Sequence, residues 1–382
     1  MLALTEMQEM ICSSVNEFLV HEYSFAQRAA SLEAPGALAP GVWQSFADMG
    51  WLGLPLSEDD GGIGGGAMES GLLMRAFGRH LVVEPFIASV LLGTRLLAAG
   101  ANPALREKWL PLLIDGSARV VLAHDEALLR DPWRARRTRA SAHGNGYRLD
   151  GAKSIVAGAP GADALLVTAQ LDDGSEGLFI VPANAQGVTL SPCRTLDGAH
   201  AADLRLDGVL LDGDARLACD VTGLLAEAVV SQCWEASGAM QAALEQTAAY
   251  VNERMQFGQA IGKFQVVQHR LAEMAVCCEE ALAACQLAAL RIDSDPSSAS
   301  AMAALVKSKV ARGAQVVARE AVQLHGAMGV SEELAIASYF RKLLAFSQQG
   351  EDAGGASQRY GALMLAGGGY RASRTLLTGK GA

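Results

Sequence analysis

The sequence predicts an α+β protein of three parts: a helical N-terminal domain, a middle antiparallel β domain and a C-terminal four-helix bundle. Three observations lead to this expectation. Apolar residues recur at helical spacing up to about residue 116, short strands with tight turns follow, and long helical runs return near residue 220. A chain of 382 residues is also long for one core. We therefore place the domains at residues 1–116, 117–219 and 220–382.

The N-terminal domain is predicted from apolar spacing and from helix-start signals. Apolar residues at steps of three to four from Leu4 to Leu19 lie on one helical face. Thr5 and Gln8 have the spacing of a capping box, in which each side chain bonds the backbone N–H of the other. Further helices are expected at residues 42–49, 68–79, 85–99 and 104–115.

The other two domains are predicted from a change of pattern. Apolar runs at residues 164–168, 177–182 and 187–190 are typical of strands, and the pairs Asn145-Gly146 and Asp173-Gly174 are typical of hairpin turns. After them, helices are expected at residues 224–255, 264–293 and 298–328, which together form an antiparallel bundle.

Composition argues against several classes of function. The net charge of −10 disfavours a nucleic-acid partner, which requires a surplus of Lys and Arg. No apolar run reaches the ~20 residues of a membrane span, and the acidic first residues differ from a signal peptide. The seven cysteines include no CxxC pair. We therefore expect a reduced, cytoplasmic protein without a metal site.

Two short stretches contain residue types that occur in ligand-binding motifs. The glycine-rich residues 61–66 lack GxGxxG spacing and a Lys-Ser/Thr ending, so we interpret them as a turn before a helix. Residues 254–265 read Arg-Met-Gln-Phe-Gly-Gln-Ala-Ile-Gly-Lys-Phe-Gln. A helix end, a loop and a new helix explain the glycines of that stretch, but not Arg254, Phe257 and Gln265 as a set.

That set resembles the signature of the acyl-CoA dehydrogenase family, in which this loop binds the FAD of a neighbouring subunit. The resemblance implies that Arg254 meets the cofactor diphosphate, which suits a planar donor of permanent charge. It also implies that Phe257 packs on the cofactor and that Gln265 makes polar contacts.

The resemblance extends along most of the chain. Residues 323–329, Gln-Leu-His-Gly-Ala-Met-Gly, resemble a second family motif. It implies that Gln323 and Gly326 approach the dinucleotide of the partner subunit, because glycine permits close approach. Residues 43–66 and 147–153 resemble family segments of the first two domains, and Tyr339-Phe-Arg-Lys resembles the segment that leads to the active site.

The chain departs from the family where the flavin ring is expected. Asp125 stands at the position of a Thr in a Thr-Glu-Pro segment, and residues 124–131 lack the Gly-Ser turn that follows it. Residues 155–157, Ile-Val-Ala, stand where the family has an aromatic residue, Ile and Thr. The resemblance therefore places Asp125, Ile155 and Ala157 against the flavin, with fewer hydroxyl contacts.

The larger departure concerns the catalytic base. The family removes the α-proton of a thioester with a Glu in a Tyr-Glu-Gly-Thr context, which requires a carboxylate in a dry pocket. That position falls on Gly350, or with one gap on Gln349. The sequence leaves three alternatives: Glu351 as the nearest carboxylate, Glu227 on an earlier helix, or a chain with no base of its own.

A missing base resembles the small subunits of heteromeric dehydrogenases such as pimeloyl-CoA dehydrogenase. We therefore expect an FAD-dependent subunit that desaturates an acyl-CoA with a bulky or dicarboxylic acyl group, as in pimelate or steroid side-chain breakdown. Electrons would pass to an electron-transfer flavoprotein. The expected assembly is a homo- or hetero-oligomer, such as a tetramer with a larger paralogous subunit. Two alternatives are a silent partner that completes another chain's FAD site, and a flavin oxidase or monooxygenase.

Overall fold

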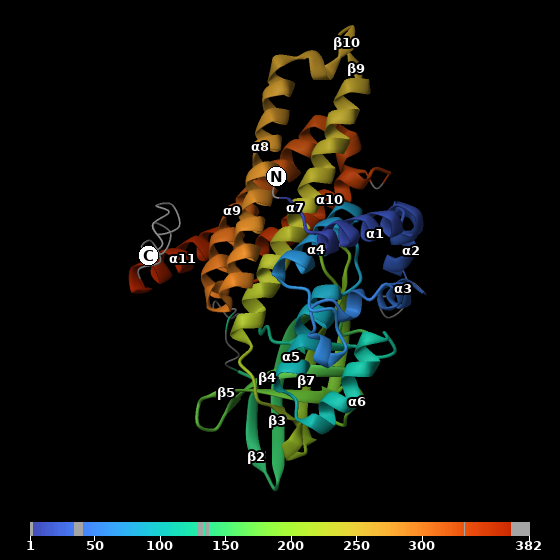
Figure 1. The fold of residues 1–382 in the computed structure, drawn as a ribbon. Coiled ribbons are helices and arrows are strands. Elements are labelled where there is room, and N and C mark those ends of the chain that lie inside the picture. Colours follow the sequence, from blue (N-terminus) through green and yellow to red (C-terminus); the bar gives the residue numbers. More distant parts are fainter. Residues whose placement is uncertain (1–2, 34–40, 128–132, 134–136, 332, 368–382) are drawn as a thin grey trace.

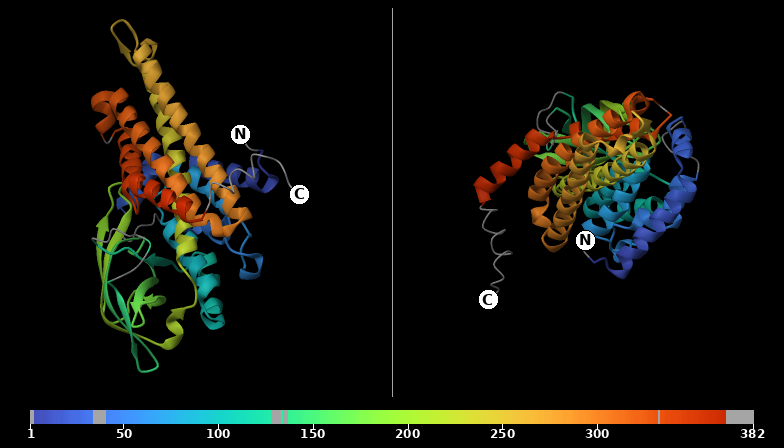
Figure 2. Two further views of the ribbon diagram at one scale, coloured as in Figure 1. Left: turned by 90° about the vertical axis from the view of Figure 1, so that its left-hand side faces the viewer. Right: turned by 90° about the horizontal axis from the view of Figure 1, so that it is seen from above.

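The computed structural model has a helical N-terminal domain, a middle β sheet and C-terminal helices, which confirms the predicted fold class (Figure 1). The described residues are 3–33, 41–127, 133, 137–331 and 333–367. The sheet lies at one end of the molecule, and the C-terminal helices run from it to the opposite end (Figures 1 and 2). None of the described helices is long and apolar enough to cross a membrane.

The N-terminal domain consists of short helices around α4. The Thr5–Gln8 capping box is confirmed: Thr5 Oγ1 accepts from the Gln8 amide, and Gln8 Oε1 accepts from the Thr5 amide. The helix expected at residues 85–99 is a π-helix followed by an α-helix. The elements are α1 (Glu6–Glu22), α2 (Phe25–Glu33), α3 (Val42–Asp48), η1 (Trp51–Gly53), η2 (Glu58–Asp60), α4 (Ala67–His80), η3 (Ile87–Thr94), α5 (Arg95–Gly100) and α6 (Pro103–Ile114).

The glycine-rich residues 61–66 form the turn before α4. A Cβ on Gly62 would lie 2.3 Å from the Leu56 carbonyl oxygen, so the turn requires glycine there. The amides of Ala67 and Met68 at the start of α4 donate to the carboxylate of Asp293 at 2.7 and 3.1 Å. This helix start therefore binds an anion that the chain itself supplies.

The middle sheet is largely antiparallel, as predicted, and it also contains parallel pairs. Its order is β6-β7-β3-β2-β4-β5-β8, and β1 pairs with β4. Both β1 and β2 run parallel to β4, each along a different part of it. The strands are β1 (Val120–Ala123), β2 (Arg139–His143), β3 (Gly146–Ala157), β4 (Ala164–Leu171), β5 (Glu176–Pro182), β6 (Val188–Arg194), β7 (His200–Leu211) and β8 (Arg216–Leu217).

Long helices dominate the C-terminal domain. Figure 1 shows α7 and α8 extending beyond the other elements, with the β9–β10 hairpin at their tip. The elements are α7 (Thr222–Glu253), β9 (Met255–Gln256), β10 (Gln259–Ala260), η5 (Ile261–Lys263), α8 (Gln265–Ser294), η6 (Pro296–Ser298), α9 (Ala299–His325), η7 (Gly326–Val330), α10 (Ala335–Gln348) and α11 (Ala353–Gly367).

One hydrophobic core joins the N-terminal and C-terminal helices. At its centre α4 and α7 approach backbone to backbone. A Cβ on Gly78 would lie 1.8 Å from the Glu235 carbonyl oxygen, and a Cβ on Gly238 would lie 1.9 Å from the Arg75 carbonyl oxygen. Because each glycine faces the other helix, the two helices can only pack this closely with glycine at both positions.

Candidate functional site

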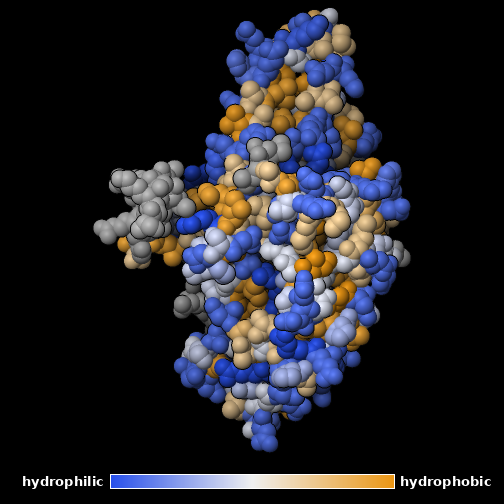
Figure 3. Space-filling view, in the orientation of Figure 1, coloured by the Kyte–Doolittle hydropathy of each residue, from blue (hydrophilic) through white to orange (hydrophobic). Residues whose placement is uncertain are grey.

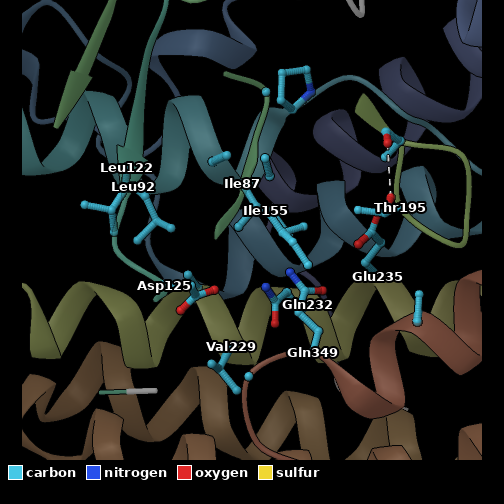
Figure 4. A pocket seen from close by; sticks show the side chains of 18 of the residues that line it. Ile87, Leu92, Leu122, Asp125, Ile155, Thr195, Val229, Gln232, Glu235 and Gln349 are labelled. Atoms are coloured by element: carbon cyan, nitrogen blue, oxygen red, sulfur yellow. Dashed lines mark hydrogen bonds between the residues drawn. The ribbon is translucent and has the colours of Figure 1, made fainter. Parts of the chain in front are cut away.

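A cavity of about 490 Å³ lies where the three parts of the chain meet. Its walls come from η3, from the chain after β1, from the end of β3, from α7, and from the end of α10 with the residues that follow it. Figure 4 shows α7 along one wall, with Gln232 and Glu235 projecting from it into the space. The cavity therefore depends on how the domains pack rather than on any single segment.

The three residues expected against the flavin all line this cavity: Asp125, Ile155 and Ala157. Asp125 follows β1, and its carbonyl accepts a hydrogen bond from the Ser154 amide at 2.9 Å. Burial raises the pKa of the Asp125 carboxyl, and the Lys153 ammonium opposes that shift only in part. The structure thus brings together positions that lie thirty residues apart in the sequence.

A buried ion pair fixes the segment that carries Asp125. Lys153 Nζ lies 2.9 Å from Glu126 Oε1 and donates to the His124 carbonyl at 3.0 Å. Glu126 also accepts from the Thr138 amide at 2.9 Å. Because both charges are inaccessible to solvent, the pair depends on complete hydrogen bonding. Residues 128–131 of the expected flavin segment lie outside the described residues.

Ile155 occupies an unusual backbone conformation at the cavity wall. Its φ is 52°, in the left-handed region that β-branched residues rarely adopt. The Ile155 amide donates to Asp203 Oδ1 at 2.9 Å, and the pairing of β3 with β7 shifts register here. Figure 4 shows the side chain pointing toward Gln232 and Gln349. The register shift therefore directs an apolar side chain into the cavity.

Glu351, the first candidate base, also lines the cavity, but Arg359 binds it. Arg359 Nε lies 3.0 Å from one carboxylate oxygen of Glu351 and 2.8 Å from the other. Gln349 and Gly350, the two positions at which the family base was expected, line the cavity and carry no carboxylate. Arg359 therefore takes up one acceptor site on each oxygen of Glu351, and the remaining lone pairs are left for a ligand.

Glu227, the second candidate base, lies outside the cavity. Its Oε2 is 2.7 Å from Arg95 Nη1, and Glu227 does not line the cavity, whereas the neighbouring Ala228 does. A helix directs adjacent side chains about 100° apart, so one of them faces the cavity and the other faces α5. This geometry argues against Glu227 as a base.

The residues expected to contact a partner's cofactor lie at the far end of the C-terminal helices. Arg254 and Phe257 belong to the β9–β10 hairpin, and Gln265 begins α8. Phe257 is 91% exposed with a φ of 52°. Among the described residues the Arg254 side chain has no hydrogen-bond or ion-pair partner. A φ in the left-handed region is strained for a phenylalanine, and such strain is common at ligand-binding positions.

The second motif lies at the same end of the bundle. Gln323 and Gly326 are exposed near the end of α9, and Gly326 has a φ of 63°. The Tyr250 and His325 rings stack with their centroids 4.3 Å apart, which joins the end of α9 to α7 four residues before Arg254. The structure thus gathers both motifs on one exposed end.

Comparison with known proteins agrees with these motifs. The chain matches the models "Acyl-CoA dehydrogenase, N-terminal domain" over residues 5–117 and "Acyl-CoA dehydrogenase, C-terminal domain" over residues 221–350. Acyl-CoA dehydrogenase FadE27 of Mycobacterium tuberculosis is 30% identical over 308 residues, which are 78% of this chain and 81% of that protein. The chain belongs to the acyl-CoA dehydrogenase family.

Two solved structures share the fold over nearly the whole chain. The ChsE4–ChsE5 complex of Mycobacterium tuberculosis is 26% identical with a TM-score of 0.88, covering 95% of this chain and 98% of that chain. A variant of the Tcur3481–Tcur3483 steroid ACAD is 28% identical with a TM-score of 0.88, covering 95% and 99%. The family consists of FAD-dependent oxidoreductases that act on CH–CH bonds.

The donor set of this acyl-CoA dehydrogenase chain fits the phosphate part of FAD at the hairpin. Arg254 offers an exposed guanidinium without a partner among the described residues, and four residues later Gly258, whose φ is 78°, lies in the turn of the hairpin. Glu235 is the cavity residue nearest the hairpin along α7, and at 1.5 Å per residue Arg254 lies about 30 Å from it. The hairpin thus lies far from the chain's own cavity.

The sequence did not predict the charged cluster of the cavity. Lys342 Nζ lies 2.7 Å from Glu235 Oε1 and 3.5 Å from Asp197 Oδ2. Burial raises the pKa of Glu235, and Lys342 opposes this shift only in part. One signal was available: Glu235 is the only charged residue between Glu227 and Glu245, in an otherwise uncharged and mostly apolar helical run. A lone charge in such a run indicates a buried partner.

Proposed function

We propose that this chain is a subunit of an FAD-dependent acyl-CoA dehydrogenase that desaturates an acyl-CoA thioester between its α and β carbons. An electron-transfer flavoprotein would receive the electrons. The observation that carries the proposal is the exposed, unpartnered guanidinium of Arg254 at the tip of α7 and α8, far from the chain's own cavity. A charge and a ring so placed favour contact with FAD across a subunit interface.

The surface below the hairpin supports an oligomer. Figure 3 shows hydrophobic side chains on the upper part of the molecule around α7 and α8, below the tip. On α8 the exposed apolar residues are Val266, Val276, Leu287 and Leu290, which are 46–60% exposed. Apolar residues gathered on one helix favour a protein partner. We propose a homo- or hetero-oligomer, such as a tetramer with a larger paralogous subunit.

Residues of this chain would contact a cofactor at two sites: the exposed end of the C-terminal helices and the chain's own cavity. Arg254 would bind the diphosphate of a neighbour's FAD, Phe257 would pack on that cofactor, and Gln265, Gln323 and Gly326 would approach it. Asp125, Ile155 and Ala157 would lie beside the ring of a flavin in the chain's own cavity. Bound FAD supplies the acceptor for the hydride that leaves the β carbon.

Glu351 is the proposed base of the chain's own cavity, and its test is a single substitution. A carboxylate that takes the α-proton must lie in the cavity with a free oxygen. Glu351 meets the first condition, and it meets the second through the lone pairs that Arg359 does not occupy. With Glu351 as the base, Glu351→Gln lowers the rate of flavin bleaching by acyl-CoA at least 100-fold, while FAD content is unchanged.

The Glu351–Arg359 ion pair also favours a second candidate function, a silent partner subunit. In that case this chain completes the FAD site of a catalytic partner and removes no proton itself. Bleaching in the Glu351→Gln complex would then stay within about threefold of wild type. Expression of this chain alone separates the two functions further, because a silent partner would show neither yellow colour nor bleaching without the product of the adjacent gene.

The interface role of Arg254 has its own experiment. In the complex co-expressed with the adjacent gene product, Arg254→Gln should weaken FAD binding roughly 10- to 100-fold, because a charged hydrogen bond contributes about 1.5–3 kcal/mol. Arg254→Lys should give an intermediate loss, since lysine keeps the charge without the planar fork. Arg205→Gln, at a 75% exposed position on β7, is the control. Equal FAD content in all of these proteins would contradict the interface role.

A further inference from the structure

The cavity has an apolar end and a polar end. Figure 4 shows Leu92, Leu122 and Val229 at one end, and Thr195 and Glu235 at the other. We use the name "polar end" for the part formed by Glu84, Thr195, Asp197, Glu235 and Lys342, all of which line the cavity. These residues come from the first, second and third parts of the chain, so the polar end exists only in the folded protein.

Lys342, the cation of the polar end, and the neighbouring Arg28 are both bound by the chain itself. Burial alone would lower the pKa of Lys342, but Glu235 and Asp197 raise it above its ordinary value. The ammonium is therefore charged and shared between two carboxylates. Arg28 donates from Nε to the Leu81 carbonyl at 2.9 Å and from Nη2 to the Asp197 carbonyl at 3.1 Å. Lys342 and Arg28 thus already bind acceptors that belong to the chain.

The acceptors at the polar end are only partly satisfied. Glu84 is 6% exposed, and its Oε2 accepts from the Tyr23 hydroxyl at 2.7 Å and from the Val83 amide at 3.3 Å. Its Oε1 is buried without a hydrogen-bond partner among the described residues. Glu235 binds Lys342 through Oε1, and its side chain is 13% exposed, so its carboxylate remains accessible to a ligand in the cavity. An unpaired buried oxygen costs about 1–3 kcal/mol, which a donor on a ligand would recover.

Three kinds of acyl group would interact differently with these oxygens. An alkyl end would leave Glu84 Oε1 unpaired and would offer Glu235 no donor. A carboxylate end would bring a further negative charge beside Glu84, Asp197 and Glu235, whose shared cation Lys342 is already bound. A hydroxyl end both donates and accepts, so it pairs with Glu84 in either protonation state. This matters because burial raises the pKa of Glu84.

We propose that the polar end binds a hydroxyl group of the acyl substrate, so that the cavity selects hydroxylated acyl thioesters over dicarboxylic and plain alkyl ones. The proposal rests on the proposed function, since it takes the ligand to be an acyl-CoA. It narrows the substrate class expected from the sequence: a bulky group fits the cavity when it carries a hydroxyl, and a dicarboxylic group does not.

Isothermal titration of the FAD-loaded protein, with its partner subunit where one co-purifies, tests the proposal. The probes are octanoyl-CoA, ω-hydroxyoctanoyl-CoA and suberyl-CoA, with the matching six-carbon set of hexanoyl-CoA, ω-hydroxyhexanoyl-CoA and adipyl-CoA. At one length or both, the hydroxyl thioester should bind at least tenfold more tightly than the dicarboxylic one and about threefold more tightly than the alkyl one.

Two variants connect this selectivity to the polar end. Glu84→Gln and Glu235→Gln each remove one negative charge, so each should reduce the discrimination against the dicarboxylic thioester at least threefold. Glu245→Gln removes a half-exposed carboxylate that pairs with Arg79 outside the cavity, and it should leave the ratio unchanged. The ratio of the affinities of two ligands, measured on one protein sample, does not depend on the fraction of that protein that is correctly folded.

The outcomes separate this proposal from the proposed function. A dicarboxylic thioester that binds as tightly as the hydroxyl one at both lengths overturns the polar-end proposal, as does a ratio unchanged in both variants. Lack of binding by all six thioesters overturns it too, even when acyl-CoA still bleaches the flavin. Tighter binding of the hydroxyl thioester without any bleaching of the flavin supports the polar-end proposal and contradicts the dehydrogenase function.

Discussion

The carboxylate of Glu351 accepts from Arg359 Nε at 2.8 and 3.0 Å, and Arg359 Cζ lies 4.1 Å from the centroid of the Trp133 ring. The guanidinium is therefore held between a carboxylate and an aromatic face. Both charged side chains are less than one-fifth exposed, so the pair lies where its attraction is only weakly screened by water. The ion pair thus links the cavity wall to α11.

The first prediction concerns the strength of that link. A double-mutant cycle of Glu351→Gln and Arg359→Gln, read by urea unfolding, should give a coupling energy of about 1–2 kcal/mol. The control cycle uses Glu280 and Lys309, a half-exposed ion pair that should couple by less than about 0.5 kcal/mol. Equal coupling in the two cycles would show that Arg359 does not hold Glu351.

The second prediction concerns acid stability. Burial alone would raise the pKa of Glu126, but Lys153 and the Thr138 amide lower it to about 2. A carboxyl with a depressed folded-state pKa stabilises the fold above its unfolded pKa of about 4.3, and that stabilisation disappears as the pH falls toward 2. The unfolding free energy of Glu126→Gln should therefore vary less with pH than that of wild type between pH 4.5 and 2. This is about the interval between the unfolded and folded pKa values of Glu126.

Lys307 gives a third prediction, at alkaline pH. Burial lowers the pKa of this lysine to about 8, against about 10.4 in the unfolded chain. Between these values the unfolded state binds more protons, so the stability of wild type should rise with pH by up to about 3 kcal/mol relative to Lys307→Met. Chemical unfolding at several pH values measures this difference. Lys309→Met, at a half-exposed site two residues away, should leave the rise in place.

The fourth prediction concerns the contact between α4 and α7. Gly78→Ala places a methyl group 1.8 Å from the Glu235 carbonyl oxygen, so the helices must separate. The cost should be about 1–3 kcal/mol or more. Gly361→Ala on α11 meets nothing within 4 Å and should stabilise by about 0.5–1 kcal/mol. Thermal unfolding of both variants checks this, and a neutral Gly78→Ala would contradict the close approach.

Local patterns accounted for much of the fold, and contacts across the chain did not follow from them. The Thr5–Gln8 capping box was predictable because its two residues lie in one helical turn. The parallel pairing of β1 with β4 was not, because strand direction depends on the path of the chain between them. The same distinction applies to the site. Residues 254–265 are one continuous stretch, whereas Glu235 and Lys342 meet only when α7 packs against α10.

Glu351 and Arg359 show a further limit of sequence reasoning. They are eight residues apart, and a loop and the start of α11 lie between them, so no helical spacing rule predicts the ion pair. Arg254 shows the opposite case, because its helix-end position and its neighbours were readable without any tertiary information. Its lack of a partner became evident only in the folded chain.

The exposure of Phe257 affects how copies of the protein without a partner would behave in a cell. A 91% exposed aromatic ring at the end of two long helices offers any other chain an apolar contact. Copies made in excess of their partner would present that ring, together with the exposed Leu365 of α11, to the rest of the proteome. In the proposed hetero-oligomer, balanced synthesis of the subunits would thus protect the protein from aggregation as well as complete the proposed cofactor site.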